Sequence, residues 1–300
     1  MTDRFSVCPA CASTEIAARR GFTEKHLYAC ATCGLTFDER IPTQTELEEY
    51  YRQYSYGSLK PCPEATKSSF RRLLGEFEAW RENGRILDIG CGQGDFLVSA
   101  LESGWSAFGH EFSESAATLC KARGIDMASG PLSQETFPGG AFDVITAFEV
   151  IEHINAPNDF FRAAHALLRR GGLFYCTTPN FNAILRHIEG ADFKMVVYPE
   201  HLIFYTAKSL RQLAVEHGFV PIQIRTTGID IARLKTAFAS KQAPRAHHEC
   251  DDLVGRRAVN DAFRASVGKS LVLTIGKELV NSALSLTQTG DTLKGYFLKA

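Results

Sequence analysis

The chain has 300 residues, of which 45% are hydrophobic and 22% are charged, an ordinary composition for a globular protein. Lysine and arginine total 33, aspartate and glutamate total 34, and the formal net charge is −1, which excludes a strongly basic nucleic-acid binder. The sequence contains no apolar stretch of about 18 residues, and its first residues lack the order of a secretory signal. We therefore expect a cytoplasmic protein that binds neither membranes nor nucleic acid.

Four of the nine cysteines form two short pairs near the N-terminus. Cys8 and Cys11 make one CxxC pair, and Cys30 and Cys33 make the second. This spacing allows four thiolates to surround one tetrahedral ion, which is typical of structural zinc. Four free thiols, or two redox CxxC motifs, are the alternative. The sequence predicts a small zinc-ribbon domain over residues 1–40.

The remaining elements are taken in chain order. Within the ribbon, β segments are expected at 22–28 and 35–37. Residues 41–83 are expected to form a linker with helices at 43–56 and 64–82. From there strands and helices alternate, which predicts α/β architecture with a largely parallel sheet. The expected strands are 85–89, 105–111, 125–128, 142–147, 173–177, 219–227 and 292–298. The expected helices are one ending at 101 and those at 113–121, 157–168 and 206–217, with Gly171-Gly172 ending the third.

Residues 230–288 interrupt this alternation. Apolar residues in this segment recur at helical spacing, and basic residues outnumber acidic ones. The segment predicts a helical insertion packed on the core. A lid over the substrate, or a helix that forms a homodimer, are the alternatives. The core domain then comprises residues 84–229 and 289–300.

The strongest chemical signal is the segment ILDIGCGQGDF, residues 86–96. A buried strand runs into Gly90, Gly92 and Gly94 and then into a helix, so that the backbone and the helix N-terminus can approach a ligand closely. The spacing is GxGxG, and Asp88 lies at the strand end. A carboxylate there repels a pyrophosphate but favours an ammonium group. These features favour S-adenosylmethionine over a dinucleotide.

A second acidic residue supports the same cofactor. Glu111 follows the second expected strand, about 20 residues past the glycine loop, where a carboxylate can accept both ribose hydroxyls of an adenosine. The alternative is an acid that favours the N-terminus of its own helix.

The segment FEVIEH follows the fourth expected strand, at the sheet edge where ligands of open α/β sheets bind. If this turn is helical, Glu149, Glu152 and His153 share one face. With His201, they could then grip a divalent ion such as magnesium. Alternatively, His153 is a general base or a buried hydrogen-bonded residue. Both interpretations place His153 and His201 at the methyl acceptor, so we expect His153, His201 and Glu149 to be catalytic.

The ordered motifs LDIGCGQGDF, GHEFS, FDVITAFEVIEHI, RRGGLFYCTTPN and PEHLIFYT resemble class I S-adenosylmethionine-dependent methyltransferases, and the branch of ubiquinone-biosynthesis O-methyltransferases in particular. The paired cysteines resemble a bacterial subgroup with a zinc ribbon ahead of this domain. The resemblance implies a doubly wound, Rossmann-like sheet of seven strands, the last antiparallel. It implies a cofactor site formed by Asp88, Gly90, Cys91, Gly92, Gly94, Glu111, Phe112, Gly130, Leu132 and Phe148. The ExxEH segment with a later histidine resembles the magnesium site of small-RNA 2′-O-methyltransferases.

The function we expect is methyl transfer from S-adenosylmethionine to a hydroxyl of a small metabolite or sugar. The alternatives are a sugar C- or N-methyltransferase and a metal-dependent RNA 2′-O-methyltransferase, although the charge balance weakens the latter. A non-enzymatic alternative is a cofactor-binding scaffold that docks a partner through its ribbon.

Overall fold

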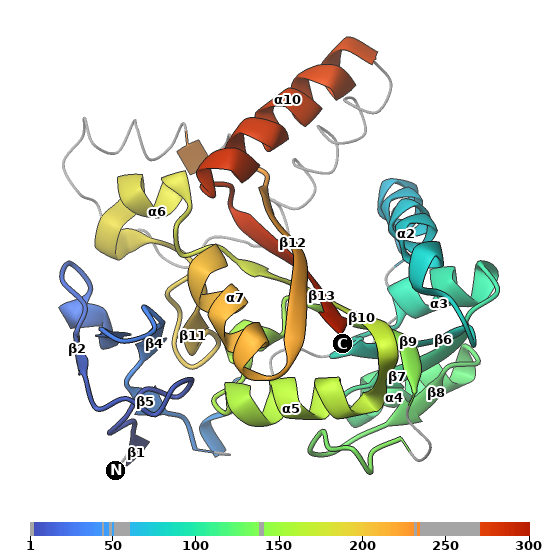
Figure 1. The fold of residues 1–300 in the computed structure, drawn as a ribbon, viewed down its shortest axis with the longest axis horizontal. Helices are drawn as coiled ribbons and strands as arrows, with labels where there is room; N and C mark the ends of the chain where they lie inside the picture. The colour runs from blue at the N-terminus through green and yellow to red at the C-terminus, as the bar shows by residue number, and fades with distance from the viewer. Residues whose placement is uncertain are drawn as a thin grey trace.

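The computed structural model describes residues 3–43, 45–47, 50, 61–137, 141–230, 233–234 and 271–300, with the backbone alone for 271–278. A central sheet lies between helices, and the N-terminal segment packs beside it (Figure 1). Within these residues, no helix combines the length and apolar character that crossing a membrane requires.

Seven strands form the central sheet in the order β12-β13-β10-β9-β6-β7-β8. Their bounds are β6 (Arg85–Ile89), β7 (Ser106–His110), β8 (Asp126–Ala128), β9 (Phe142–Phe148), β10 (Leu168–Pro179), β12 (Phe219–Thr227) and β13 (Thr292–Lys299). The strands from β8 to β10 pair in parallel, whereas β13 runs antiparallel to both β10 and β12. This topology confirms the predicted doubly wound α/β fold with an antiparallel last strand.

Helices cover both faces of the sheet. They are α2 (Glu64–Phe77), α3 (Asp95–Glu102), α4 (Glu114–Ala122), α5 (Pro157–Leu167), α6 (Ile184–Glu189), α7 (Ala207–Glu216) and α10 (Leu271–Thr287). Because alternate strand residues face opposite sides, Ile86 and Val144 pack in the cluster under α2 and α3, while Leu87 and Ile145 pack under α5 and α7. Both faces are therefore buried, as the apolar strands predict.

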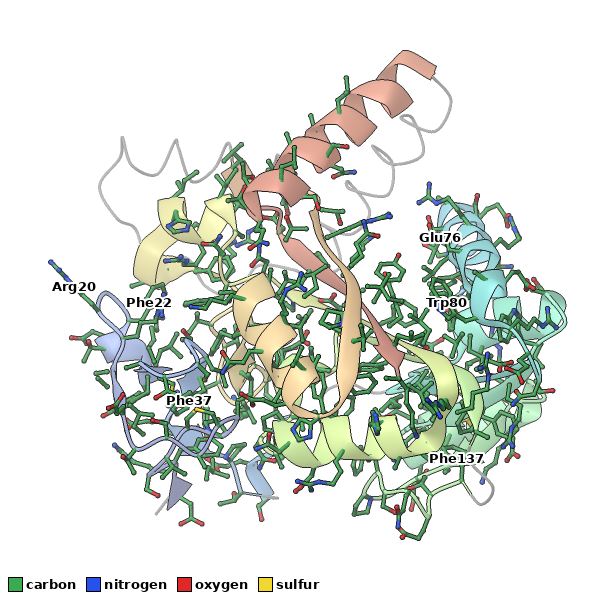
Figure 2. All side chains as sticks on the ribbon, in the orientation of Figure 1. Arg20, Phe22, Phe37, Glu76, Trp80 and Phe137 are labelled. Carbon is green, nitrogen blue, oxygen red and sulfur yellow. The ribbon has the colours of Figure 1, made fainter. Side chains whose placement is uncertain are left out.

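Residues 3–41, here named the N-terminal module, form two small sheets, a separate two-stranded sheet and a larger one that a strand of the core completes. Its strands are β1 (Asp3–Arg4), β2 (Ile16–Ala18), β3 (Leu27–Cys30), β4 (Thr36–Asp38) and β5 (Arg40–Ile41). Phe37 lies inside this module (Figure 2). It is fully buried, and its ring meets that of Phe5 edge to face. The two-residue strand β11 (Ile203–Phe204) pairs with β4, and the Asp38 N–H donates to the Leu202 carbonyl at 2.8 Å. A segment from far along the chain thus completes the sheet of the module.

Three local expectations need correction. The expected β segment at 22–28 is wrong in its first part, because Thr23–Lys25 forms a 3₁₀ turn and His26 adopts a left-handed φ of 58° before β3 begins. Strand β2 was not expected. The helix α5 ends at Leu167, and Gly171-Gly172 lie inside β10, where a Cβ on Gly172 would approach the Phe142 carbonyl oxygen to 2.9 Å. These glycines permit close strand packing instead of ending the helix.

Two helical expectations fall largely outside the described residues. Only parts of the helix expected at 43–56 are described, among them Tyr50. In the insertion at 230–288, α10 agrees with the predicted helical character, while residues 235–270 lie outside the described part.

Candidate active site

The glycine loop between β6 and α3 has the conformation that its sequence predicts. Gly90, Gly92 and Gly94 have φ angles of 69°, 53° and 75°, in the left-handed region that favours glycine. A Cβ on Gly90 would lie 2.6 Å from a methyl of Val150, and one on Gly94 would lie 2.8 Å from the Cys120 sulfur. Both the backbone conformation and the packing therefore require glycine here.

Glu111 binds the glycine loop directly. Its carboxylate accepts the Gly92 N–H at 2.9 Å through one oxygen and the Ser113 N–H at 3.0 Å through the other. Ser113 caps α4 by accepting the Ala116 N–H, so Glu111 stands before the helix and not in its first turn. This position favours the predicted ligand role of Glu111 over the alternative of a helix N-terminal acid.

Asp88 lies beneath the loop and is only 3% exposed. The Thr146 hydroxyl donates to its carboxyl oxygen at 2.7 Å across the β6–β9 pair. Burial raises the pKa of Asp88 to about 8, and the negative charge of Glu111 adds to that shift. A positively charged group beside Asp88 would lower this pKa and favour the carboxylate, so an ammonium group is compatible with the site.

Three expected cofactor residues lie beyond Glu111. Phe112 is 67% exposed, unusually so for a phenylalanine, and its ring meets His110 edge to face at 5.4 Å. The imidazole of His110 is 2.7 Å from the Gly130 carbonyl, which ties the end of β7 to the loop after β8. Leu132 follows in this loop and is half-buried against the core. These residues line up along the carboxyl ends of β7 and β8.

The last two expected cofactor residues are Phe148, at the end of β9, and Cys91, within the glycine loop itself. Phe148 packs among aromatic rings, with centroid separations of 4.9 Å to Phe96 and 5.7 Å to Tyr175. Cys91 is half-buried, and its sulfur is 4.0 Å from the Gly92 carbonyl. The structure thus gathers the ten expected cofactor residues at the carboxyl ends of β6, β7, β8 and β9.

The segment after β9 departs from the expectation of one helical face. Glu149 has a left-handed φ of 53°, and its N–H donates to the carbonyl of Thr177 at 3.0 Å. Only Ile151–His153 forms a 3₁₀ turn. Of the four residues predicted to hold a metal, the structure brings the candidate ligand atoms of Glu152, His153 and His201 within 4.8 Å of one another, without Glu149.

The two imidazoles of this cluster are held in one defined tautomer. Nδ1 of His153 is 2.6 Å from the Glu200 carbonyl, and Nδ1 of His201 is 2.7 Å from the Met195 carbonyl. Because a carbonyl only accepts, each Nδ1 carries a proton, so that in the neutral imidazole Nε2 is the basic nitrogen. The Nε2 of His153 lies 3.8 Å from the Glu152 carboxylate. Two basic nitrogens thus accompany one carboxylate.

Glu152 is the buried member, 2% exposed, and neither of its carboxylate oxygens has a hydrogen-bond partner among the described residues. Burial raises its pKa well above the usual range, and Glu149 raises it further; the nearby Thr178 hydroxyl acts in the opposite direction. Burial also lowers the pKa of His153 to about 4, and His201 contributes. Three acceptors without a donor fit a shared proton or a divalent cation.

One further contact at this site was not expected from the sequence. The Tyr50 hydroxyl donates to the Glu200 side chain at 2.6 Å, while the Glu200 carbonyl holds His153. Tyrosines cluster near Tyr50 in the sequence, but no periodicity indicates which of them reaches a partner 150 residues away.

The four cysteines of the N-terminal module converge. Cys8 and Cys33 have sulfurs 3.5 Å apart, those of Cys11 and Cys30 are 3.6 Å apart, and all four lie within 4.8 Å of one another. Four thiolates around zinc would be separated by about 3.8 Å, whereas disulfide sulfurs are about 2.05 Å apart. Burial acts to raise the pKa of Cys30, but hydrogen bonds, foremost that from the Cys33 N–H, lower it to about 7. The cluster fits a tetrahedral ion.

A family model described as a methyltransferase domain matches residues 63–224, more than half of the chain. The chain belongs to this methyltransferase domain family. The expected class, S-adenosylmethionine-dependent methyltransferases, is therefore confirmed at the level of the family, which argues against a non-enzymatic scaffold.

Two curated relatives are ubiquinone biosynthesis O-methyltransferases. The protein of Bordetella avium is 29% identical over 149 residues, which cover 44% of this chain and 62% of that protein. The protein of Pseudomonas aeruginosa is 33% identical over 127 residues, which cover 38% and 53%. The chain thus spans less than two thirds of the length of these relatives.

Two solved structures share the fold. A methyltransferase of Archaeoglobus fulgidus has a TM-score of 0.52 at 16% identity and covers 86% of this chain and all of its own length. Phosphoethanolamine N-methyltransferase 2 of Haemonchus contortus, solved in complex with S-adenosyl-L-methionine, has a TM-score of 0.51 at 17% identity and covers 86% and 57%. The described residues carry the same fold.

Proposed function

We propose that this methyltransferase transfers the methyl group of S-adenosylmethionine to a hydroxyl of a small molecule. The observation that carries the proposal is the pair of fixed imidazoles, His153 and His201, whose Nε2 lone pairs accompany a buried carboxylate at the carboxyl edge of the sheet. The names of the curated O-methyltransferase relatives support a hydroxyl acceptor.

The chemistry follows from the activated donor. The acceptor oxygen bonds to the methyl carbon, the carbon–sulfur bond breaks with its electron pair on sulfur, and the hydroxyl proton passes to an imidazole Nε2. Alignment of the two reactants supplies about 7–11 kcal/mol of the barrier. A positioned base adds about 10²–10⁴-fold. The imidazolium that forms at His153 would have its Nε2 3.8 Å from the Glu152 carboxyl and would favour the charged form of that carboxyl.

The cofactor roles follow from the loop. Asp88 favours the methionyl ammonium, Glu111 accepts the ribose hydroxyls, and the exposed ring of Phe112 offers a face for the adenine. Glu111→Gln is expected to weaken the binding of S-adenosylmethionine at least tenfold in calorimetry. Glu114→Gln, a charge in the first turn of α4, is the matched control and should bind normally. Equal affinity of both variants would remove Glu111 from the site.

The base is tested by kinetics. We expect His153→Ala and His201→Ala each to lower kcat by about 10²–10⁴ in a screen of small phenols and polyols, with unchanged affinity for the cofactor. His26→Asn is the control, because asparagine tolerates the left-handed backbone of His26. If both histidine variants keep wild-type kcat, neither imidazole is the base.

The cysteine cluster, Cys8, Cys11, Cys30 and Cys33, is proposed to hold a structural zinc ion. Four thiolates leave no open coordination position, so the ion would stabilise the module and take no part in the reaction.

A divalent cation among Glu152, His153 and His201 is the second candidate for the acceptor side. Two imidazoles and one carboxylate suit a borderline metal such as Zn²⁺ or Mn²⁺ better than the magnesium expected from the sequence. Such a cation would lower the pKa of a bound hydroxyl. Metal analysis distinguishes a divalent cation from a histidine base. If a cation is bound, Glu152→Gln should lose one equivalent of metal that Glu200→Gln retains. Equal metal content in both variants favours a histidine base without a metal.

A further inference from the structure

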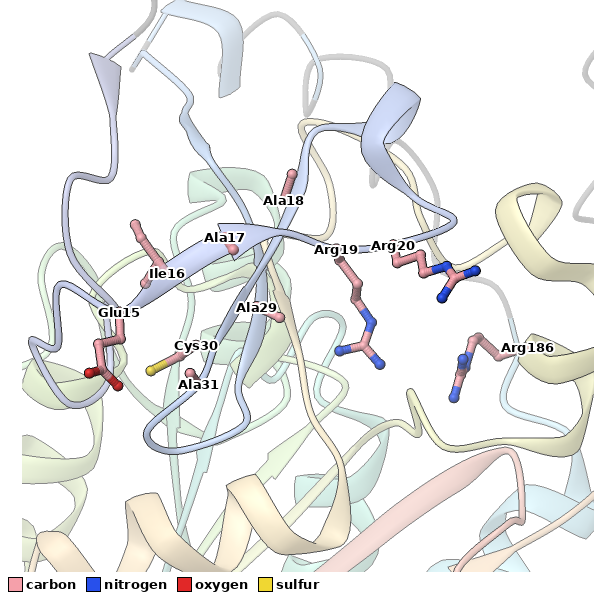
Figure 3. Close-up of a pocket in the computed structure, with 10 residues that line it drawn as sticks. All are labelled: Glu15, Ile16, Ala17, Ala18, Arg19, Arg20, Ala29, Cys30, Ala31 and Arg186. Carbon is pink, nitrogen blue, oxygen red and sulfur yellow. The ribbon is translucent and has the colours of Figure 1, made fainter.

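A second pocket lies outside the candidate active site, where the N-terminal module meets α6 (Figure 3). It has a volume of about 580 Å³ and is lined by β2, β3 and the turn after β2 on one side and by Arg186 of α6 on the other. Three arginines, Arg19, Arg20 and Arg186, gather at one end, and Glu15 lies at the other (Figure 3).

The arginines have no carboxylate partner among the described residues. Arg19 and Arg186 instead flank one aromatic ring, with guanidinium carbons 4.9 and 5.0 Å from the centroid of Phe181. Arg19 donates to the Thr36 hydroxyl at 2.9 Å, and Arg186 donates to the Phe181 carbonyl at 2.7 Å. Nη2 of Arg186 also lies 2.9 Å from Nε2 of His187. Each guanidinium carries five N–H donors, so Arg19 and Arg186 each keep at least three for a ligand.

Like charges placed together in a partly buried site require compensation. Burial lowers the pKa of Arg186, and the positive charge of Arg19 lowers it further. The pKa of the adjacent His187 is lowered by burial and by both arginines. This concentration of positive charge stands in a chain whose formal net charge is −1, so it is local and not part of a broadly basic surface.

We propose that this pocket binds the phosphate group of a small organic phosphate. A planar guanidinium donates two parallel N–H bonds to a phosphate, and two or three such groups around one cavity match a dianion. The buried ring of Phe181, which both guanidinium groups contact, restrains Arg19 and Arg186 and so reduces the entropy lost on binding.

The position of the pocket relates it to the acceptor. Thr178 lies next to Glu152. Phe181 follows Thr178 by three residues, so the Cα atoms of Phe181 and Thr178 are at most about 11 Å apart. This proximity makes a phosphorylated methyl acceptor the class of ligand that we expect the pocket to bind. This second step rests on the proposed function, whereas phosphate binding itself does not.

The test is calorimetric titration of the full chain with inorganic pyrophosphate at constant ionic strength. The wild-type protein should bind one equivalent, and Arg186→Gln and Arg20→Gln should each weaken it at least tenfold. Arg20 is exposed and makes no hydrogen bond to another described residue, so its variant keeps the test valid if Arg186→Gln misfolds. Arg211→Gln, an exposed arginine on α7, is the control.

Each outcome decides one point. No pyrophosphate binding by the wild-type protein, or equal affinity in all variants, overturns the proposal. Parallel titration with S-adenosylmethionine should give wild-type affinity in each arginine variant. If the wild-type protein does not bind S-adenosylmethionine, the proposed function is contradicted, whereas the conclusion on pyrophosphate binding is unaffected.

Discussion

The rings of His153 and His201 meet edge to face with centroids 4.9 Å apart, although they follow different strands of the sheet. A backbone hydrogen bond joins the two segments, since the Leu202 N–H donates to the Glu152 carbonyl at 2.8 Å. The residue after one histidine is therefore bonded to the residue before the other. This bond fixes their relative position before any ligand binds.

Asp88 should release a proton when the cofactor binds. Burial raises its pKa to about 8, so the carboxyl is mostly protonated at pH 7, and an incoming ammonium group would lower that pKa. Calorimetry in buffers of different ionisation enthalpy should show release of up to one proton at pH 7 and little at pH 9. Asp88→Asn should abolish the release, while Asp126→Asn, an exposed neighbour on β8, should not. Identical proton counts in Asp88→Asn and wild type would contradict this assignment.

Gly94 and Gly75 should respond oppositely to alanine. A Cβ on Gly94 would clash with Cys120 and carry a φ of 75°, so Gly94→Ala should lower the free energy of unfolding by about 2–4 kcal/mol. Gly75 lies within α2 with no atom within 4 Å of its Cβ position, so Gly75→Ala should raise it by about 0.5–1 kcal/mol. Urea unfolding measures both. If both substitutions lowered the free energy of unfolding by similar amounts, the predicted clash at Gly94 would not explain the effect of Gly94→Ala.

The cysteine cluster should contain one zinc ion per chain. Cys33→Ser is expected to lose most of this zinc, measured by plasma mass spectrometry, and to lower Tm, because the ligand set is broken. Cys62→Ser is the matched control, since Cys62 lies outside the cluster. A full zinc content in Cys33→Ser would exclude the four-thiolate site.

Asp143 should make stability depend on acid pH. This fully buried carboxylate accepts the N–H groups of Glu82, Asn83 and Gly84, and pairs with Arg169. Burial acts to raise its pKa, but Arg169 and these N–H groups lower it overall. A depressed folded pKa gives stability that is present above the unfolded value near 4 and is lost as pH falls through the folded pKa.

Asp143→Asn should therefore lower the free energy of unfolding by about 3 kcal/mol at pH 7. The difference from wild type should shrink below about pH 4 in urea melts. Asp159→Asn, which alters an exposed ion pair, should change stability little at either pH. A constant difference between Asp143→Asn and wild type across this range would refute the linkage.

The predictions from the sequence are most accurate where a few neighbouring residues determine the structure. The strand Arg85–Ile89 has the predicted bounds, because an apolar run lies between Gly84 and Gly90. The helix expected from Glu149 to His153 is not present. Three polar residues at helical spacing in so short a stretch cannot distinguish a helix from a 3₁₀ turn that follows a left-handed residue.

The remaining features depend on contacts between distant segments. The pairing of Arg19 with Arg186 around Phe181 arises only when the N-terminal module packs against α6. Likewise, the bond from Tyr50 to Glu200 links residues 150 positions apart. No periodicity or motif in a single sequence carries such information.

Strand β11 belongs to the core in sequence but depends on the N-terminal module for its only strand partner among the described residues. In its sheet the two residues pair with β4 alone, and His201 stands just ahead of them. A catalytic core cut free before residue 63 would leave Ile203 and Phe204 as a bare edge without a partner, open to aggregation. Truncating the N-terminus would thus disturb the segment that carries His201, far from the cut in sequence.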